Sequence, residues 1–175
     1  EFGLGSPEGF QFNMSVGYDL DGIKGRKVNT YINNMMDAGK TAQFKECKKV
    51  LTELFPEEKD FIASISPNVS RSVTLSTLHG CPPQEIERIA SYLLKEKHLH
   101  TFVKCNPTIL GYKTARSILD SMGYDYIVFD EHHFNEDLQW EDAVPMFERL
   151  QKLADKQDLE FGLKLSNTFP VDTTR

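Results

Sequence analysis

The hydrophobic and polar positions of this chain follow two periods, one typical of strands and one typical of helices. The clearest helix is predicted over residues 84–97, where apolar residues recur every three or four positions and charged residues fill the opposite face. Its apolar stripe consists of Ile86, Ile89, Ala90, Leu93 and Leu94. Short apolar runs at 72–76 and 101–103 flank this helix, so the stretch 71–111 is predicted to form a βαβ unit.

The same periods predict further elements in alternating order. Strands are expected over 10–16, 126–129 and 161–165, and helices over 28–36, 44–55, 114–122 and 139–156. Gly123 is placed to end the helix before it, and Pro145 falls within the first turns of the last helix. Residues 56–68 form a mixed connector that has no clear period.

Strands and helices therefore alternate strictly, with five strands and at least four helical connections. Such alternation predicts a parallel sheet with right-handed crossovers, and short apolar strands suit a sheet that is covered on both faces or closed into a barrel. The expected fold is α/β, a partial (β/α)8 TIM barrel of about five βα units, with a complete doubly wound sheet as the alternative. Residues 1–175 are expected to be a single segment of such a barrel within a longer multidomain chain, because the sequence begins without methionine.

Composition narrows the functional classes. The 175 residues are 39% hydrophobic and 26% charged, which is typical of a globular domain with a real core. The net charge of −6 argues against binding to nucleic acid or to an anionic membrane surface. No apolar run approaches the roughly 20 residues that cross a bilayer, and no leader pattern opens the chain, so a cytoplasmic location is expected. The three cysteines lack zinc spacing and are expected to be reduced.

Polar residues gather directly after the predicted strands. In βα proteins the carboxyl ends of the parallel strands form the usual site face. The five predicted strand ends carry Asn13, Ser15, Ser76, Thr77, His79, Cys81, Lys104, Asn106, Asp130, Glu131, His132, His133, Lys164 and Asn167.

Two lysines lie inside apolar strands, Lys104 in FVKCNP and Lys164 in FGLKLSNT. A lysine in such surroundings requires an anionic ligand or a carboxylate partner, because an unpaired buried charge is costly. For Lys104 the structural alternative is an ion pair with Asp130 or Glu131. Either lysine could instead form a Schiff base, since a desolvated lysine loses its proton more readily.

The other candidates carry open alternatives. Asn106 precedes Pro107, so a turn role competes with a binding role, and the same holds for Asn167. Cys81 follows Gly80 in a tight loop, where its thiol could act as an acid or base or could be a passive small residue. The pair His132-His133 has no metal-ligand spacing, and no metal is expected. The chain contains no glycine-rich phosphate loop.

At these residues the sequence resembles a known family. The segments VTLSTLHGCPPQEIERIASYLL, HTFVKCNPTILGY, YDYIVFDEHHF and FGLKLSNT, with FQFNMSVGYDLDGIK upstream, are similar to the family of putative selenate reductase flavoprotein subunits. The resemblance runs from about residue 9 to residue 168. That family is similar in turn to the flavin domain of dihydropyrimidine dehydrogenase and to dihydroorotate dehydrogenases.

The resemblance implies an FMN-binding (β/α)8 barrel. Lys104 matches a family lysine that ends a strand shortly before a proline, so it would bind the electron-rich pyrimidine edge of the flavin and act in catalysis. Asn106, Lys164 and Asn167 would complete the cofactor site. Cys81 lies in the loop that carries the proton donor or acceptor of the dehydrogenases. The expected substrate contacts are Asn13, Ser76, His79 and Asn167.

The expected function is thus that of a barrel segment in an FMN-dependent oxidoreductase, with a small-molecule substrate and with other redox domains or subunits as partners. The resemblance assigns FAD, NAD(P) and iron–sulfur centres to those other modules. Barrels of this type hold the cofactor phosphate with loops after their last two strands, so this segment is expected to be inactive alone. The alternatives are a Schiff-base lyase on the same barrel and a non-catalytic barrel that docks redox subunits.

Overall fold

The computed structural model describes residues 12–76, 80–165, 167–168 and 170–173 of the chain. The chain divides into two compact units. The larger comprises residues 15–23 and 73 onward, and the smaller comprises the residues up to 14 and residues 24–72.

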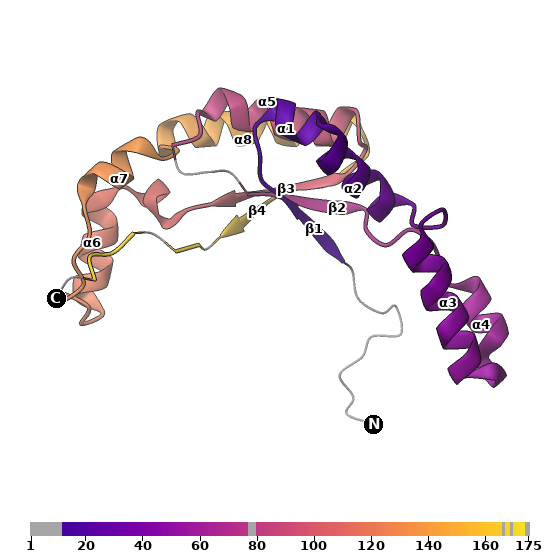
Figure 1. Cartoon of the computed structure of the whole chain (residues 1–175). Coiled ribbons are helices and arrows are strands. Elements are labelled where there is room, and N and C mark those ends of the chain that lie inside the picture. Colours follow the sequence, from indigo (N-terminus) through magenta and orange to yellow (C-terminus); the bar gives the residue numbers. More distant parts are fainter. Residues whose placement is uncertain (1–11, 77–79, 166, 169, 174–175) are drawn as a thin grey trace. The chain divides into compact units, whose positions relative to one another are not determined.

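Most of a parallel sheet lies in the larger unit, and its strands follow the order β1-β2-β3-β4 (Figure 1). The strands are β1 (Asn13–Val16), β2 (Ser72–Leu75), β3 (His100–Cys105) and β4 (Phe161–Leu165). β3 and β4 pair in parallel, with Thr101 opposite Phe161 and Lys104 opposite Lys164. This arrangement confirms the predicted α/β class and is consistent with part of a barrel.

A helix layer covers one face of this sheet. The helices of the larger unit are α1 (Leu20–Lys24), α5 (Pro83–Lys95), α6 (Tyr112–Ser121), α7 (Glu131–Glu136) and α8 (Trp140–Lys156), with a short 3-10 turn η2 (Pro107–Leu110). α5 packs against both α8 and β3, and α8 packs against β4 (Figure 1). The βαβ unit that the sequence predicted is therefore confirmed as β2, α5 and β3.

The core of the larger unit lies between this helix layer and the sheet. The predicted apolar stripe of α5 is buried throughout, with no member more than 2% exposed. The buried residues of β2, β3 and α8 in this core include Val73, Leu75, Val103, Ala143, Met146, Leu150 and Ala154. Burial of one such leucine or isoleucine side chain contributes about 1.5–3 kcal/mol, so this contact is the main stabilising feature of the unit.

The two faces of β3 differ in burial. Thr101, Val103 and Cys105 are buried, whereas the alternate residues, including Phe102 and Lys104, are half-buried. Because successive strand residues point to opposite faces, the buried set faces the helices and Lys104 lies on the other face. The Phe102 ring lies against Gly162 of β4, where an added Cβ would come within 2.6 Å of the ring.

The predicted strand over residues 126–129 is wrong. Neighbours for β3 are already present on both sides, β2 and β4, so the apolar run finds no place beside β3. Its backbone is satisfied differently: the Arg116 guanidinium donates to the carbonyls of Tyr124 and Ile127, and the Asp172 amide donates to the Val128 carbonyl. The part of the chain that the structure describes therefore has four strands rather than five.

The polar residues after that run do not form a strand end either. Asp130 is the N-cap of α7, and its side chain accepts a hydrogen bond from the His132 amide at 2.7 Å. His132 lies one turn from Glu136, with its Nε2 3.2 Å from a carboxylate oxygen. Phe129, Phe134 and Tyr112 pack as an aromatic cluster that holds α7 against α6, with ring centroids 5.3–5.7 Å apart.

The smaller unit is helical. Its elements are α2 (Arg26–Met36), α3 (Ala42–Leu54), the 3-10 turn η1 (Pro56–Glu58) and α4 (Lys59–Ser64). α3 begins after an N-cap, Thr41, whose hydroxyl accepts from the Phe44 amide. α3 and α4 pack side by side, and Lys48 donates to the Ala63 carbonyl at 2.8 Å (Figure 1). The predicted connector over 56–68 is therefore partly helical.

Helix prediction elsewhere is confirmed within a few residues at each end, and Gly123 follows α6 with a φ of 83°, as a helix-ending glycine requires. Every helix that the structure describes is too short or too polar to cross a bilayer.

Replacement of Leu93 by alanine tests the core. Leu93 is fully buried, so L93A is expected to lower the free energy of unfolding of the larger unit by about 2–5 kcal/mol. Urea unfolding followed by the fluorescence of Trp140, the one tryptophan, measures the change. The control is I118A on α6, where the side chain is 44% exposed and the expected loss is below about 1 kcal/mol. Equal losses in both variants would contradict the packing described.

The ion pair between Arg149 of α8 and Glu87 of α5 predicts a pH dependence. The guanidinium donates two bonds of 2.7 Å to the carboxylate and holds the pKa of Glu87 below its ordinary value of 4.5. A carboxyl with a lowered folded-state pKa stabilises the fold above its unfolded pKa, and this stabilisation is lost as the pH falls through the folded pKa. R149Q should therefore be less stable than wild type at neutral pH, with the difference vanishing in acid. Urea titrations at two pH values, with K152Q as the exposed control on the same helix, would detect this. A difference that persists in acid would show that the pair is not its source.

Candidate functional site

A buried carboxylate, Asp137, lies at the centre of the strand-end loops. It is 7% exposed and follows α7 directly. Its Oδ1 accepts from the Gly80 amide at 2.9 Å, and its Oδ2 accepts from Thr108 Oγ1 at 2.8 Å and Asn106 Nδ2 at 3.2 Å. Burial of a charge without such donors is costly, so these bonds fix the loop after β2 and the loop after β3 to the segment before α8.

Gly80 supports this arrangement through its backbone amide, and Gln139 supports it through its side-chain amide. Gly80 has a φ of 74°, which a residue with a side chain adopts only with strain, and its amide reaches Asp137 from this conformation. The Gln139 amide nitrogen donates to the carbonyls of Phe134 and Asp137 and so closes the turn between α7 and α8.

The two asparagines that the sequence singled out are brought together. Asn106 follows β3 and Asn167 follows β4, and Asn167 Nδ2 donates to Asn106 Oδ1 at 2.7 Å. The contact joins residues 61 positions apart, so neither side chain serves only its own turn. A series of hydrogen bonds from Asp137 through Asn106 to Asn167 thus runs across the carboxyl ends of both strands.

Lys104 and Lys164 lie opposite each other in the register of β3 and β4. Register partners on parallel strands point to the same face, so two positive charges stand side by side on the face away from the helices. Lys104 is half-buried and Lys164 is exposed. Within the described ranges neither ammonium has a hydrogen bond or an ion pair, and the expected alternative of a Lys104 pair with Asp130 or Glu131 does not form there.

A small recess lies between Lys104 and the hydrogen-bonded side chains of Asn106 and Asp137. Cys81, Lys104, Asn106, Thr108 and Asp137 line it together. It has room for about one water molecule. Any larger ligand must therefore lie over the strand ends rather than inside the recess.

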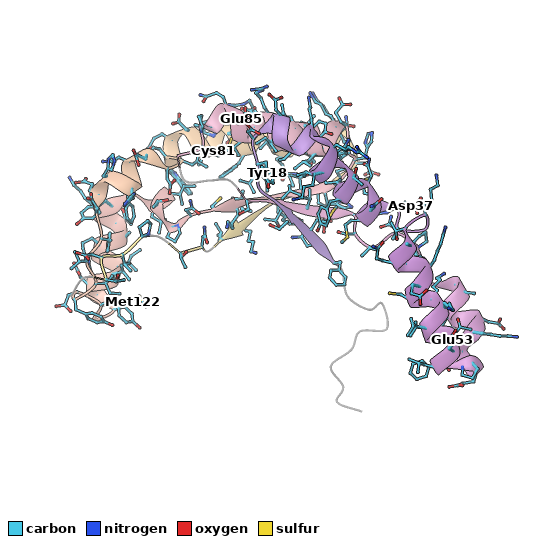
Figure 2. All side chains as sticks on the ribbon, in the orientation of Figure 1. Tyr18, Asp37, Glu53, Cys81, Glu85 and Met122 are labelled. Carbon is cyan, nitrogen blue, oxygen red and sulfur yellow. The ribbon has the colours of Figure 1, made fainter. Side chains whose placement is uncertain are left out.

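Cys81 lines this recess and precedes α5. Figure 2 labels it together with Glu85. Partial burial, and then the charge of Glu85, raise the pKa of the Cys81 thiol. The group is therefore protonated at neutral pH, which suits a proton donor better than a thiolate nucleophile. Glu85 is held in place because its carboxylate accepts from the Leu20 amide at 2.9 Å and pairs with Arg88.

The remaining candidates are less well placed. Ser76 is half-buried, and its amide donates to the Val16 carbonyl at the end of β1. Ser15 is exposed on β1, and Asn13 is exposed in the smaller unit. Thr77 and His79 lie outside the described residues. His132 and His133 lie exposed on α7, and across the described ranges no three His, Cys, Asp or Glu side chains are grouped to hold a metal ion.

Sequence reasoning missed Asp137 and Thr108. The segment NEDLQW carries two acidic residues before a helix, a pattern that any exposed helix start shares. Burial of Asp137 among donors that lie 57, 31 and 29 residues away is visible only in three dimensions.

Comparison with known proteins gives two kinds of match. The family model described as the N-terminal TIM-barrel domain of oxidoreductase YgfK matches residues 1–175. The chain is 44% identical over 178 residues to the protein named "Putative oxidoreductase YgfK" of Escherichia coli strain K12, and equally to that of E. coli O157:H7. Each match covers 93% of this chain and 17% of the relative, so the chain spans about a sixth of these proteins. No solved structure matches the chain at a significant level.

The raised pKa of Cys81 predicts slow alkylation. At neutral pH iodoacetamide should modify Cys81 more slowly than the exposed Cys47, because only the thiolate reacts. E85Q removes the nearby negative charge while keeping an oxygen acceptor for the Leu20 amide, so it should lower the pKa and speed the reaction. Mass spectrometry of the modified peptides over a pH series measures both rates, and Cys47 provides the internal control. An unchanged Cys81 rate in E85Q would exclude Glu85 as a cause.

Proposed function

Because the chain belongs to the family of YgfK N-terminal TIM-barrel domains, we propose that it is part of the barrel of an FMN-dependent oxidoreductase. In this proposal the flavin lies over the carboxyl ends of β3 and β4. Family membership supports the assignment to an oxidoreductase. The proposal that the cofactor is a flavin is based on the arrangement of the strand ends. The finer type, that of a selenate reductase subunit similar to dihydropyrimidine and dihydroorotate dehydrogenases, rests on the motif resemblance.

The observation that carries the proposal is the register pair of Lys104 and Lys164. Like charges opposite each other destabilise a sheet, and within the described residues neither lysine has a carboxylate partner. An electron-rich or anionic ligand across the two ammonium groups relieves this repulsion. The pyrimidine edge of a flavin is such a ligand, and active sites of barrels lie at this end of the strands.

The other residues of the site fit the same ligand. The amides of Asn106 and Asn167 offer hydrogen bonds next to the lysines, and the face that carries Lys104 is opposite the helix layer. The recess is too small for a planar ring, so in this proposal the ring lies over the strand ends. Lys104, Asn106, Lys164 and Asn167 would thus hold the cofactor, which when bound would supply hydride or electron transfer.

The chain contributes one further group, the thiol of Cys81. Because its pKa is raised, it would keep a proton at neutral pH at the edge of the recess, within reach of a small substrate above the ring. Substrate contacts from Ser76 and His79 belong to the same proposal. Modules carrying FAD, NAD(P) and iron–sulfur centres in the rest of the longer protein would serve as redox partners.

A Schiff-base lyase is the rival that uses the same lysines. It requires a desolvated amine, and the exposure of Lys164 and the half-burial of Lys104 give it less support. Borohydride treatment of the full-length protein with a carbonyl substrate separates the two functions, because only the lyase would leave a reduced adduct on Lys104 or Lys164.

Flavin content of a full-length protein that carries this chain tests the proposal. K104A should weaken FMN binding by on the order of 10- to 100-fold, as expected for the loss of a hydrogen bond to a charged donor. The visible absorbance spectrum after supply of FMN and gel filtration measures the bound flavin, and K152A on α8 is the matched exposed control.

Three results would decide against the proposal as stated. A full-length wild-type protein that stays colourless after supply of FMN removes the flavin assignment. Full flavin content in K104A removes the assignment of this lysine. Equal loss in K104A and K152A would point to a general effect of charge.

A further inference from the structure

We infer that Asp137 is a positioning residue, which sets the orientation of the amides of Asn106 and Asn167 so that the site presents an amide oxygen to an N–H group of its ligand. The inference rests on the proposed function and specifies the ligand edge that the site selects. Asp137 is a buried carboxylate to which the proposed function assigns no role.

The Asp137 carboxylate has a fixed orientation and offers only acceptors. An ionised carboxylate only accepts hydrogen bonds, whereas an amide side chain can turn either its oxygen or its nitrogen to a partner. The Gly80 amide donates to Oδ1 of Asp137 and the Thr108 hydroxyl donates to Oδ2, so the orientation of this buried group is fixed.

The carboxylate determines which way the Asn106 amide is turned. Because Oδ2 of Asp137 accepts, Asn106 must turn its nitrogen towards it, and the distance is 3.2 Å. The oxygen of the same amide then faces the other way, where Asn167 Nδ2 lies 2.7 Å from it. The reverse orientation of Asn106 would set its oxygen against the carboxylate and is repulsive.

Asn106 in turn determines which way the Asn167 amide is turned. Since it must donate to Asn106, its nitrogen faces Asn106 and its Oδ1 is left without a hydrogen-bond partner in the part of the chain that the structure describes. The carboxylate thus determines, through two amides, that the group available for a ligand is an acceptor. Without Asp137 both amides can turn over, and Asn167 can present a donor instead.

The arrangement specifies a chemical pattern. Lysine ammonium groups only donate, and Asn167 Oδ1 only accepts. A ligand with a carbonyl oxygen beside an N–H group satisfies both, as a lactam or the edge of a cyclic imide does. The pyrimidine ring of an oxidised flavin carries this edge, and methylation of its N3 nitrogen removes the donor while leaving the carbonyls.

The experiment compares FMN with N3-methyl-FMN on the full-length apoprotein. Wild type should bind FMN more tightly by on the order of tenfold, the equivalent of one lost hydrogen bond. In D137N the ratio of the two dissociation constants should fall towards one, because the amides are no longer oriented. N106L removes the next amide in the series of hydrogen bonds and should give the same result. It therefore provides the test if D137N does not fold.

The matched control is T108V. This substitution removes a bond to the same oxygen of Asp137 but leaves the path through Asn106 and Asn167 in place. A purely structural role of Asp137 predicts similar losses of stability in T108V and D137N with unchanged selectivity. The positioning role predicts that selectivity changes in D137N and N106L but not in T108V.

The outcomes separate the two proposals. If wild type binds both flavins and the ratio is the same in D137N and N106L, the positioning role is overturned while the flavin function stands. If wild type binds neither flavin, the flavin function itself fails, together with the ligand edge inferred from it. A ratio that falls in D137N and N106L alone establishes the positioning role.

Discussion

The hydrogen-bond requirement of one buried carboxylate determines how the strand-end loops are arranged. Asp137 is removed from water, so its oxygens must be satisfied by protein donors, and these come from the loops that follow β2 and β3. Apolar packing holds the helix layer on the sheet, but it does not fix polar loops of this kind. The geometry of the candidate site is therefore set by polar satisfaction, and its precision depends on a single group.

The alternation of β3 separates the two tasks of the sheet. The β3 residues that face α5 and α8 are buried and supply stability. The residues that alternate with them include Phe102 and the site residue Lys104. Gly162 leaves room for the Phe102 ring beside β4 on this second face. Substitutions on one face therefore affect the other mainly through the strand backbone.

Prediction from sequence succeeded where a signal was local. The stripe of α5 and the glycine after α6 identify their elements because period and turn chemistry act over a few residues. The run at 126–129 failed because an apolar run does not reveal whether its carbonyls pair with a strand or, as here, with Arg116. Lys104 and Lys164 stand out as charges in apolar strands, but their register, like the partners of Asp137, depends on the pairing of distant segments.

The register pair of lysines also has a consequence for how the protein is assembled in a cell. Two ammonium groups on neighbouring strands repel each other, so a ligand that binds between them would stabilise the folded state relative to the unfolded one. Occupancy and folding are then thermodynamically linked. A shortage of the ligand during synthesis would lower the amount of folded protein, and its supply would raise the half-life of the chain against proteolysis.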